Sequence, residues 1–253
     1  MRRIKEDVLK EIPDKNEEII YTKLSEEQEK LYYANLQQIK KGLHKKTSSE
    51  FNSEKLKILA AITRLRQICC APALVYEDYQ GGSAKMDTCL ELIQNAIEGG
   101  HKILLFSQFT SIFDLLEPRL KKEKISFFRL DGSTNKIKRA FMVDNFNNDD
   151  TPLFLISLKA GGTGLNLTSA SIVIHFDPWW NIAAQNQATD RTHRIGQTKV
   201  VSVFKLIAKN TIEEKILQLQ DAKQELSDQI INEGGASIAN LTKDDFEQLL
   251  EGM

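Results

Sequence analysis

The 253-residue sequence is poor in the features that mark several common classes of protein. It has three cysteines, Cys69, Cys70 and Cys89, an odd number without the spacing of metal ligands. That usage argues against a disulfide framework or a zinc site and indicates buried thiols in a reducing compartment. No apolar run approaches the length of a membrane span, and the charged opening MRRIKEDVLKEIP is not an export signal. We therefore expect no membrane partner.

The sequence also lacks an excess of charge of either sign. Its net charge is −1, with 41% hydrophobic and 27% charged residues, which is ordinary for a soluble globular domain. A whole-molecule basic field of the kind that attracts nucleic acid is therefore absent. Any contact with a nucleic acid must come from a local patch.

A third absence concerns nucleotide chemistry. The sequence contains no G-x-x-x-x-G-K-[ST] loop and no acidic metal-binding box of the D-E-x-H type. A complete nucleoside-triphosphatase site needs that lysine and an acid that binds Mg²⁺. This chain alone is therefore not expected to form such a site.

The first third of the chain reads as a short strand followed by a helical hairpin. Residues 18–24 (EIIYTKL) are rich in strand-forming residues, and Ser25 with Gln28 matches a helix N-terminal capping box. Helical spacing then continues to about Leu74, with a turn expected over residues 44–53 and Pro72 as the stop.

After a glycine-containing linker, apolar runs of strand length alternate with amphipathic helices. The expected strands are residues 102–107, 125–130, 153–157, 172–176 and 200–207, and the expected helices are residues 86–98, 110–122 and 135–147. Strands that are apolar on both faces and alternate with helices indicate a parallel sheet with helices on both faces. Two further helices are expected at the end, over residues 211–232 and 242–251.

Polar and glycine-rich segments follow four of these strands. They are residues 107–110, 131–134, 157–168 and 177–181, and the stretch QNQATDRTHRIGQ (185–197) comes directly afterwards. Because the carboxyl ends of parallel strands lie at the same edge, we expect these segments to converge there. Ligands of such folds bind at this edge.

The stretch 185–197 is the centre of this arrangement. Arg191 and Arg194 stand three residues apart, a spacing that would place both guanidiniums on one face of a helix ending at Gly196. Arginine suits phosphate because its planar fork stays charged and bonds two oxygens at once. The alternative is an exposed helix whose arginines pair with acids such as Asp190.

Two other segments carry candidate contacts. Gly161, Gly162 and Gly164 would let backbone N–H groups approach a phosphate, or would only shape a tight turn. Trp179 and Trp180 would stack on a nucleic acid, or would pack in the core and a crevice. His175 and His193 have no partner at metal spacing, so we expect no metal site.

Together these motifs resemble the C-terminal half of the Swi/Snf-like ATPases, DNA translocases related to superfamily-two helicases. ILLFSQF, LDGST, SLKAGGTGLNLT, DPWWN and DRTHRIGQ are similar to successive motifs of that family's second RecA-like lobe. The resemblance implies a RecA-like parallel sheet with helices on both faces, a helical hairpin insertion and a C-terminal brace helix. It implies four parts: a connector (1–24), a helical protrusion (25–80), the motor lobe (81–210) and a brace with an acidic tail helix (211–253).

The resemblance also implies roles for individual residues. Arg191 and Arg194 match arginine fingers that reach ATP held by the first lobe, and Gln187 and Asp190 match residues that hold the finger helix. Gly162, Gly164 and Leu165 match positions near the nucleotide. The matches near DNA are Ser107, Ser157, Lys159 and Trp180. Leu158 and Ile182 depart from the usual threonine and proline.

The function implied is half of an ATP-dependent translocase on double-stranded DNA, inactive as an ATPase alone. Its expected partners are an N-terminal RecA-like lobe, ATP with Mg²⁺ held by that lobe, duplex DNA, and a DNA-bound protein or RNA polymerase. A strand-separating or RNA helicase is one alternative, against which DRTHRIGQ argues. A non-catalytic interaction module is another. We expect the bacterial cytoplasm, at the nucleoid, with the nucleus as the alternative.

Overall fold

The computed structural model describes residues 13–44, 48–161, 164–194, 196–229 and 243–250. The first twelve residues of the expected connector lie outside these ranges. The contacts divide the chain into two compact units. We call Met1–Ile20, Leu90–Phe176 and Ala183–Lys205 the sheet unit, and Tyr21–Cys89, Asp177–Ile182 and Leu206–Met253 the helical unit. The fourfold division expected from the sequence stays a prediction.

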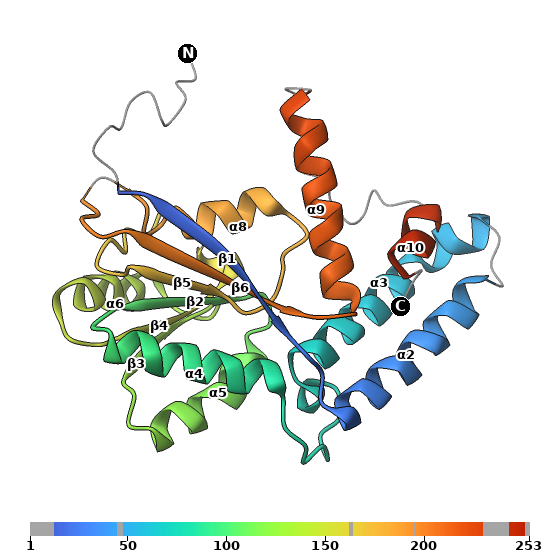
Figure 1. The fold of residues 1–253 in the computed structure, drawn as a ribbon, viewed down its shortest axis with the longest axis horizontal. Coiled ribbons are helices and arrows are strands. Elements are labelled where there is room, and N and C mark those ends of the chain that lie inside the picture. The colour runs from blue at the N-terminus through green and yellow to red at the C-terminus, as the bar shows by residue number, and fades with distance from the viewer. Residues whose placement is uncertain (1–12, 45–47, 162–163, 195, 230–242, 251–253) are drawn as a thin grey trace. The chain divides into compact units, whose positions relative to one another are not determined.

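The sheet unit is built on a six-stranded sheet. Its strands are β1 (Lys15–Thr22), β2 (Ile103–Ser107), β3 (Phe127–Leu130), β4 (Leu153–Ser157), β5 (Ile172–His175) and β6 (Val201–Ala208). Their order across the sheet is β1-β6-β5-β2-β4-β3 (Figure 1). The pairings β2–β4, β2–β5, β3–β4 and β5–β6 are all parallel. The expectation of a parallel sheet is confirmed.

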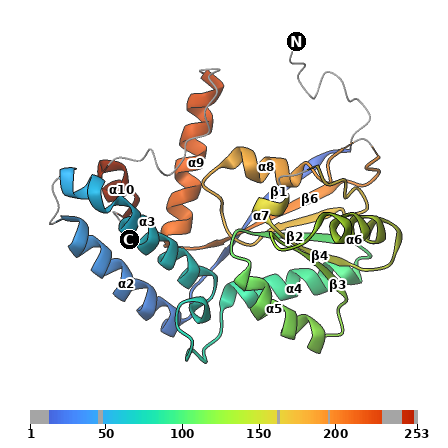
Figure 2. The ribbon, with the colours of Figure 1, turned by 180° about the vertical axis from the view of Figure 1, so that it is seen from behind.

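Helices connect the strands and cover the sheet. They are α4 (Ala84–Glu98), α5 (Ser111–Lys122), α6 (Lys136–Asn148), α7 (Leu158–Gly161) and α8 (Ile182–Thr189). In both ribbon views α4 and α5 lie on one side of the sheet and α8 on the other (Figures 1 and 2). The central strands β2, β4 and β5 are buried along their whole length, because apolar side chains on both faces pack beneath helices.

The helical unit is organised around the hairpin of α2 (Glu26–His44) and α3 (Ser48–Cys70), followed by the short 3-10 helix η1 (Pro72–Leu74). The helices α9 (Ile212–Gln229) and α10 (Lys243–Leu250) complete it. One apolar core joins these helices; its large members include Tyr32, Phe51, Ile62, Ile216 and Phe246. This core gives the hairpin its tertiary packing, which an isolated helix pair in water would lack.

Local chemistry explains where the hairpin begins and how it closes. The Ser25 hydroxyl accepts a hydrogen bond from the Gln28 N–H at 3.3 Å, as the capping box predicts. The Gln28 side chain, however, does not turn back to Ser25. Its Nε2 donates to the Ile68 carbonyl at 2.7 Å and so joins the start of α2 to the end of α3. The turn expected over residues 44–53 is shorter than predicted, because α3 already begins at Ser48.

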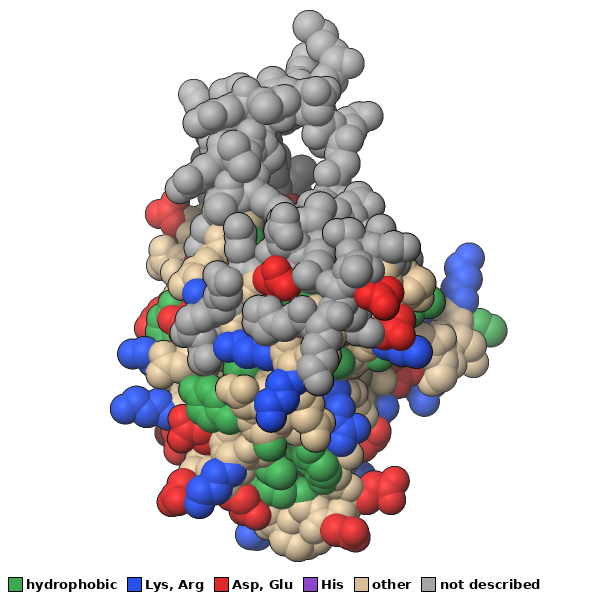
Figure 3. Space-filling view, turned by 90° about the vertical axis from the view of Figure 1, so that its right-hand side faces the viewer, with side chains coloured by type: hydrophobic (Ala, Val, Ile, Leu, Met, Phe, Trp, Pro, Cys, Tyr) green, Lys and Arg blue, Asp and Glu red, His purple; other side chains and the backbone are tan. Residues whose placement is uncertain are grey.

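The surface carries charges of both signs. On the face shown in Figure 3, acidic and basic side chains are interspersed among small apolar patches wherever the side chains are described. This pattern matches the net charge of −1. An anion would therefore be attracted only by local clusters of basic side chains. Among the described residues, no helix is long and apolar enough to cross a membrane.

Candidate functional site

The carboxyl ends of the central strands bring together two of the segments singled out in the sequence. Ser107 ends β2 and Ser157 ends β4, and the two residues are direct partners in the parallel register. Both hydroxyls bond the backbone that follows. Ser107 Oγ accepts from Phe109 N at 3.0 Å, and Ser157 Oγ accepts from Ala160 N at 3.2 Å. Both serines are buried, so in this structure they shape the turns that leave the strands.

The segment after β3 forms a closed turn. Asp131 Oδ1 accepts from the Ser133 N–H at 3.0 Å and from its hydroxyl at 2.6 Å, while Arg129 Nε donates to Oδ2 at 3.0 Å. The Ser133 bonds, helped by the Arg129 guanidinium and opposed by burial, lower the pKa of Asp131. This carboxylate is therefore ionised and committed to its own turn at neutral pH.

The arginine stretch does not form the helix that the sequence predicts. Helix α8 ends at Thr189, and Arg191 and Arg194 lie in the turns that follow. Three carbonyls that would continue the helix are bonded elsewhere. Thr189 O accepts from Thr192 Oγ1 at 2.8 Å, Asp190 O from Arg194 Nε at 2.8 Å, and Arg191 O from Leu167 N at 3.1 Å. Two side-chain donors and the backbone N–H of Leu167 thus take the carbonyls that a continued helix would use.

These bonds also join the residues around Arg191 and Arg194, here called the arginine turn, to the glycine-rich segment (residues 157–168). Besides the bond from Leu167 N, Gln197 Nε2 donates to the Ala170 carbonyl at 2.8 Å and to Thr192 O at 3.2 Å. Gly196 has φ +100°, a conformation that side-chain-bearing residues rarely adopt. Gly164 also has a positive φ, +52°, and is exposed. The two predicted phosphate-binding segments therefore form one connected structure.

The charges of two other guanidiniums act on the Arg191 side chain. Arg191 is 2% exposed, and burial together with the charges of Arg194 and Arg139 lowers its pKa, while Asp190 opposes that change. An arginine keeps its charge despite such a shift. The charges of Arg194 and Arg139 thus disfavour the cationic form of Arg191, which a nearby anion would favour.

Arg139 also acts on Arg191, although no sequence motif marks it. It lies on α6, and its Nη2 donates to the carbonyl of Ala160 in α7. Its buried Nε has no hydrogen-bond partner within the described part of the chain. No spacing to Arg191 could have revealed it, because the two residues come from different elements. Arg139 joins α6 to the start of the glycine-rich segment.

The other predicted residues of this region take different positions. Lys159 on α7, Gln187 on α8 and the backbone at Gly164 are exposed, whereas Leu165 is buried. Gly162 lies outside the described residues. Among described residues, no group of three or more His, Cys, Asp or Glu side chains could hold a metal ion.

The two histidines support the arginine turn. His175 Nε2 lies 2.9 Å from Thr189 Oγ1, and burial, together with Lys205, lowers the pKa of His175 to about 3. Its ring is therefore neutral at pH 7. His193 Nε2 donates to the Pro13 carbonyl at 2.7 Å. Both rings therefore make structural contacts with neighbouring residues.

The predicted DNA contact Trp180 belongs to the helical unit. It is partly buried and packs against the apolar core of that unit. The Arg66 guanidinium of α3 lies over its ring, with Cζ 5.5 Å from the ring centroid. The Arg66 Nη2 also donates to the Pro178 carbonyl and lies 3.6 Å from Asp177 Oδ2. No spacing in the sequence indicated a role for Arg66.

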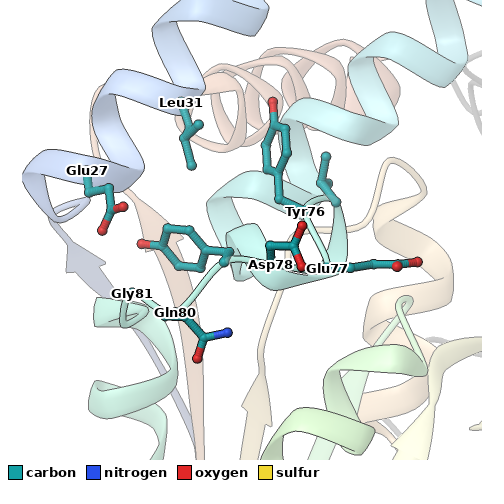
Figure 4. A pocket seen from close by; sticks show the side chains of 9 residues that line it. Glu27, Leu31, Tyr76, Glu77, Asp78, Gln80 and Gly81 are labelled. Atoms are coloured by element: carbon teal, nitrogen blue, oxygen red, sulfur yellow. The ribbon is translucent and has the colours of Figure 1, made fainter.

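The helical unit also has a hollow of about 770 Å³ between the start of α2 and residues 75–81 (Figure 4). Three of its lining residues, Glu27, Glu77 and Asp78, carry carboxylates, and Tyr76 and Tyr79 contribute rings. Carboxylates repel phosphate. This hollow is therefore no candidate for the phosphates of a nucleotide or of DNA.

Comparison with known proteins places this arrangement in a class. The helicase conserved C-terminal domain matches residues 84–196, and the SNF2-related domain matches residues 1–74. With its six-stranded RecA-like sheet, the chain contains a helicase C-terminal domain and also matches an SNF2-related domain. The C-terminal domain of the Sulfolobus solfataricus SWI2/SNF2 ATPase is 33% identical, with a TM-score of 0.75 over 94% of this chain and 99% of that one. The chain belongs to the SWI2/SNF2 family of ATPases.

Other similar proteins agree. The S. solfataricus SWI2/SNF2 ATPase core in complex with double-stranded DNA is 34% identical, with a TM-score of 0.77 over 97% of this chain and 52% of that one. An uncharacterized ATP-dependent helicase of Mycoplasma pneumoniae is 43% identical over 99% of this chain and 24% of its own length. The chain spans about a quarter of the length of the first curated relatives it matches. More distant relatives are named for DNA repair or chromatin regulation.

Proposed function

We propose that this chain is the second lobe of an ATP-driven translocase on double-stranded DNA, and that Arg191 and Arg194 act as its arginine fingers. The observation that carries the proposal is the arginine turn itself. It follows α8, is bonded to the glycine-rich segment through Leu167, and concentrates the charges of Arg191, Arg194 and Arg139. A transferring phosphoryl group is the anion for which such fixed guanidiniums are suited, since its charge spreads over several oxygens.

The proposal divides the ATPase site between two lobes. The sequence has no Walker A lysine, so another lobe would hold the ATP phosphates and the Mg²⁺ ion. This chain would add Arg191 and Arg194 when the lobes close. Asp190 would help to fix the turn, because its carbonyl accepts the Arg194 Nε bond. Gln187 is exposed on α8, where it would contact the nucleotide or the opposite lobe.

The DNA contacts would come from residues at the ends of β2 and β4 and from the DPWWN segment. Lys159 is exposed on α7, and its charge would meet a DNA phosphate. Ser107 and Ser157 would act by holding the turns that leave β2 and β4 in shape beside the same DNA strand. Trp180 would contact the duplex through the exposed part of its ring. The double-stranded DNA complex of the S. solfataricus relative supports a duplex as the substrate.

The substrate is tested with the two-lobe protein, in which a nucleotide-binding lobe precedes this chain. We expect the two-lobe protein to displace a third strand from triplex DNA when ATP is present. A motor that moves along the duplex would push the third strand off. We expect no separation of the strands of a forked duplex. Strand separation without triplex displacement would instead support the helicase alternative. ATP-independent DNA binding with no displacement would support the interaction module.

A further inference from the structure

The segment that follows β5 has an irregular backbone in the interior of the helical unit. Asp177 and Pro178 are buried, and residues 176–181 form neither helix nor strand. A buried irregular segment leaves carbonyl groups that need donors from elsewhere. The donors for two consecutive carbonyls come from two different helices. Arg66 of α3 binds Pro178 O, and Gln220 of α9 binds Trp179 O.

Arg66 makes three kinds of contact with this segment. Its side chain is 3% exposed, and the Asp177 carboxylate that faces it is fully buried. The guanidinium binds the Pro178 carbonyl through Nη2 and lies over the Trp180 indole. A planar cation can serve a carbonyl, a carboxylate and a ring face at once, which a lysine cannot. The position of the Trp180 ring is therefore tied to α3.

We propose that Arg66 is a positioning residue that holds the Trp180 indole for its contact with DNA, with Gln220 supporting the same segment from α9. This inference rests on the proposed function, in which Trp180 touches the duplex. It adds that the base of the helical hairpin and the long helix α9 set the geometry of that contact. Loss of Arg66 would leave ATP chemistry in place but weaken its response to DNA.

The positional part is tested on the 253-residue chain by fluorescence. The chain has two tryptophans, so a Trp179→Phe background leaves Trp180 as the sole reporter while keeping the carbonyl at position 179. In this background, Arg66→Met should shift the Trp180 emission to longer wavelength and increase quenching by acrylamide. Arg64→Met is the matched control, because Arg64 lies on the same helix, is exposed and stacks on Tyr76 instead. It should leave the emission unchanged.

The functional part is tested in the two-lobe protein. Arg66→Met should lower DNA-stimulated ATP turnover roughly 10- to 100-fold, the scale expected for a displaced contact group, and lower DNA-free turnover far less. Arg66→Lys should recover part of the loss, since it keeps the charge but not the fork. Combined with Trp180→Ala, Arg66→Met should add little, because both changes remove one contact.

Several results would overturn the inference. One is an unchanged Trp180 emission in Arg66→Met. Another is a loss of ATP turnover in the Arg66→Met, Trp180→Ala double variant that equals the sum of the single losses. A third is an equal loss of turnover in Arg66→Met with and without DNA. If Arg66→Met does not fold, Gln220→Met replaces it, with the same uncoupling expected and the same contrary results. Absence of DNA stimulation in the unaltered two-lobe protein would refute the proposed function instead, and the fluorescence result would still decide the role of Arg66.

Discussion

Replacing Arg191 by alanine in the two-lobe protein should lower the kcat of DNA-stimulated ATP hydrolysis by roughly 10³- to 10⁵-fold, the range known for arginine fingers. Arg194→Ala should fall in the same range. The physical reason is that each guanidinium stabilises charge that develops on the transferring phosphoryl group. The KM for ATP and the affinity for duplex DNA should change little, since the nucleotide is held by the other lobe.

One further variant separates the shape of the arginine from its charge, and another serves as a control. Arg191→Lys should recover little of the lost turnover, because lysine is a point charge without the planar fork. Lys199→Ala is the control, since Lys199 is an exposed cation beside the same turn. It should keep turnover near that of the unaltered protein. Normal turnover in both Arg191→Ala and Arg194→Ala would reduce the turn to a structural feature and favour the interaction module.

The second large effect concerns stability. Lys85 of α4 and Glu213 of α9 form an ion pair in the interior of the helical unit, at 1% and 0% side-chain exposure. Burial acts to lower the pKa of Lys85, but the adjacent Glu213 carboxylate, together with Cys70 and Cys69, outweighs burial and raises it. Glu213 Oε2 also accepts from Ala208 N at 2.8 Å. Lys85→Met should destabilise the chain by about 3–5 kcal/mol, because it leaves a buried carboxylate without its cation.

The measurement is the free energy of unfolding of the chain in urea. Adding Glu213→Gln to Lys85→Met should recover part of the loss, since glutamine removes the unpaired charge and can still accept from Ala208. Lys30→Met is the control, because the Lys30–Glu26 pair is exposed and worth little. An unfolding free energy of Lys85→Met within error of the control variant would show that the pair does not hold α4 to α9.

The sequence alone was sufficient for most of the fold. Strands β2, β4 and β5 were predicted nearly to the residue, because their apolar runs have strand length and helices follow. The capping pair Ser25 and Gln28 located the start of α2. Errors arose where side chains compete with the backbone for hydrogen bonds. The helix expected through Arg194 ends at Thr189, since Thr192 and Arg194 take carbonyls that a helix would need.

The site was predictable only in part. Motif resemblance pointed to the arginine turn and the glycine-rich segment, and the structure joins the two through Leu167 and Gln197. The partners from distant elements could not be read from spacing. Arg139 comes from α6, and Arg66 is 111 positions before Asp177 along the chain. Only the packing of the chain brings these cations to the motifs.

The most direct test of the two-lobe account is steady-state ATP hydrolysis with duplex DNA by this chain, by the N-terminal lobe, and by the two joined. We predict background rates for each part alone and DNA-stimulated turnover for the joined protein, which Arg191→Ala in this chain abolishes. Hydrolysis by the 253-residue chain alone, or undiminished hydrolysis by the joined protein with Arg191→Ala, would contradict the division of the site between two lobes.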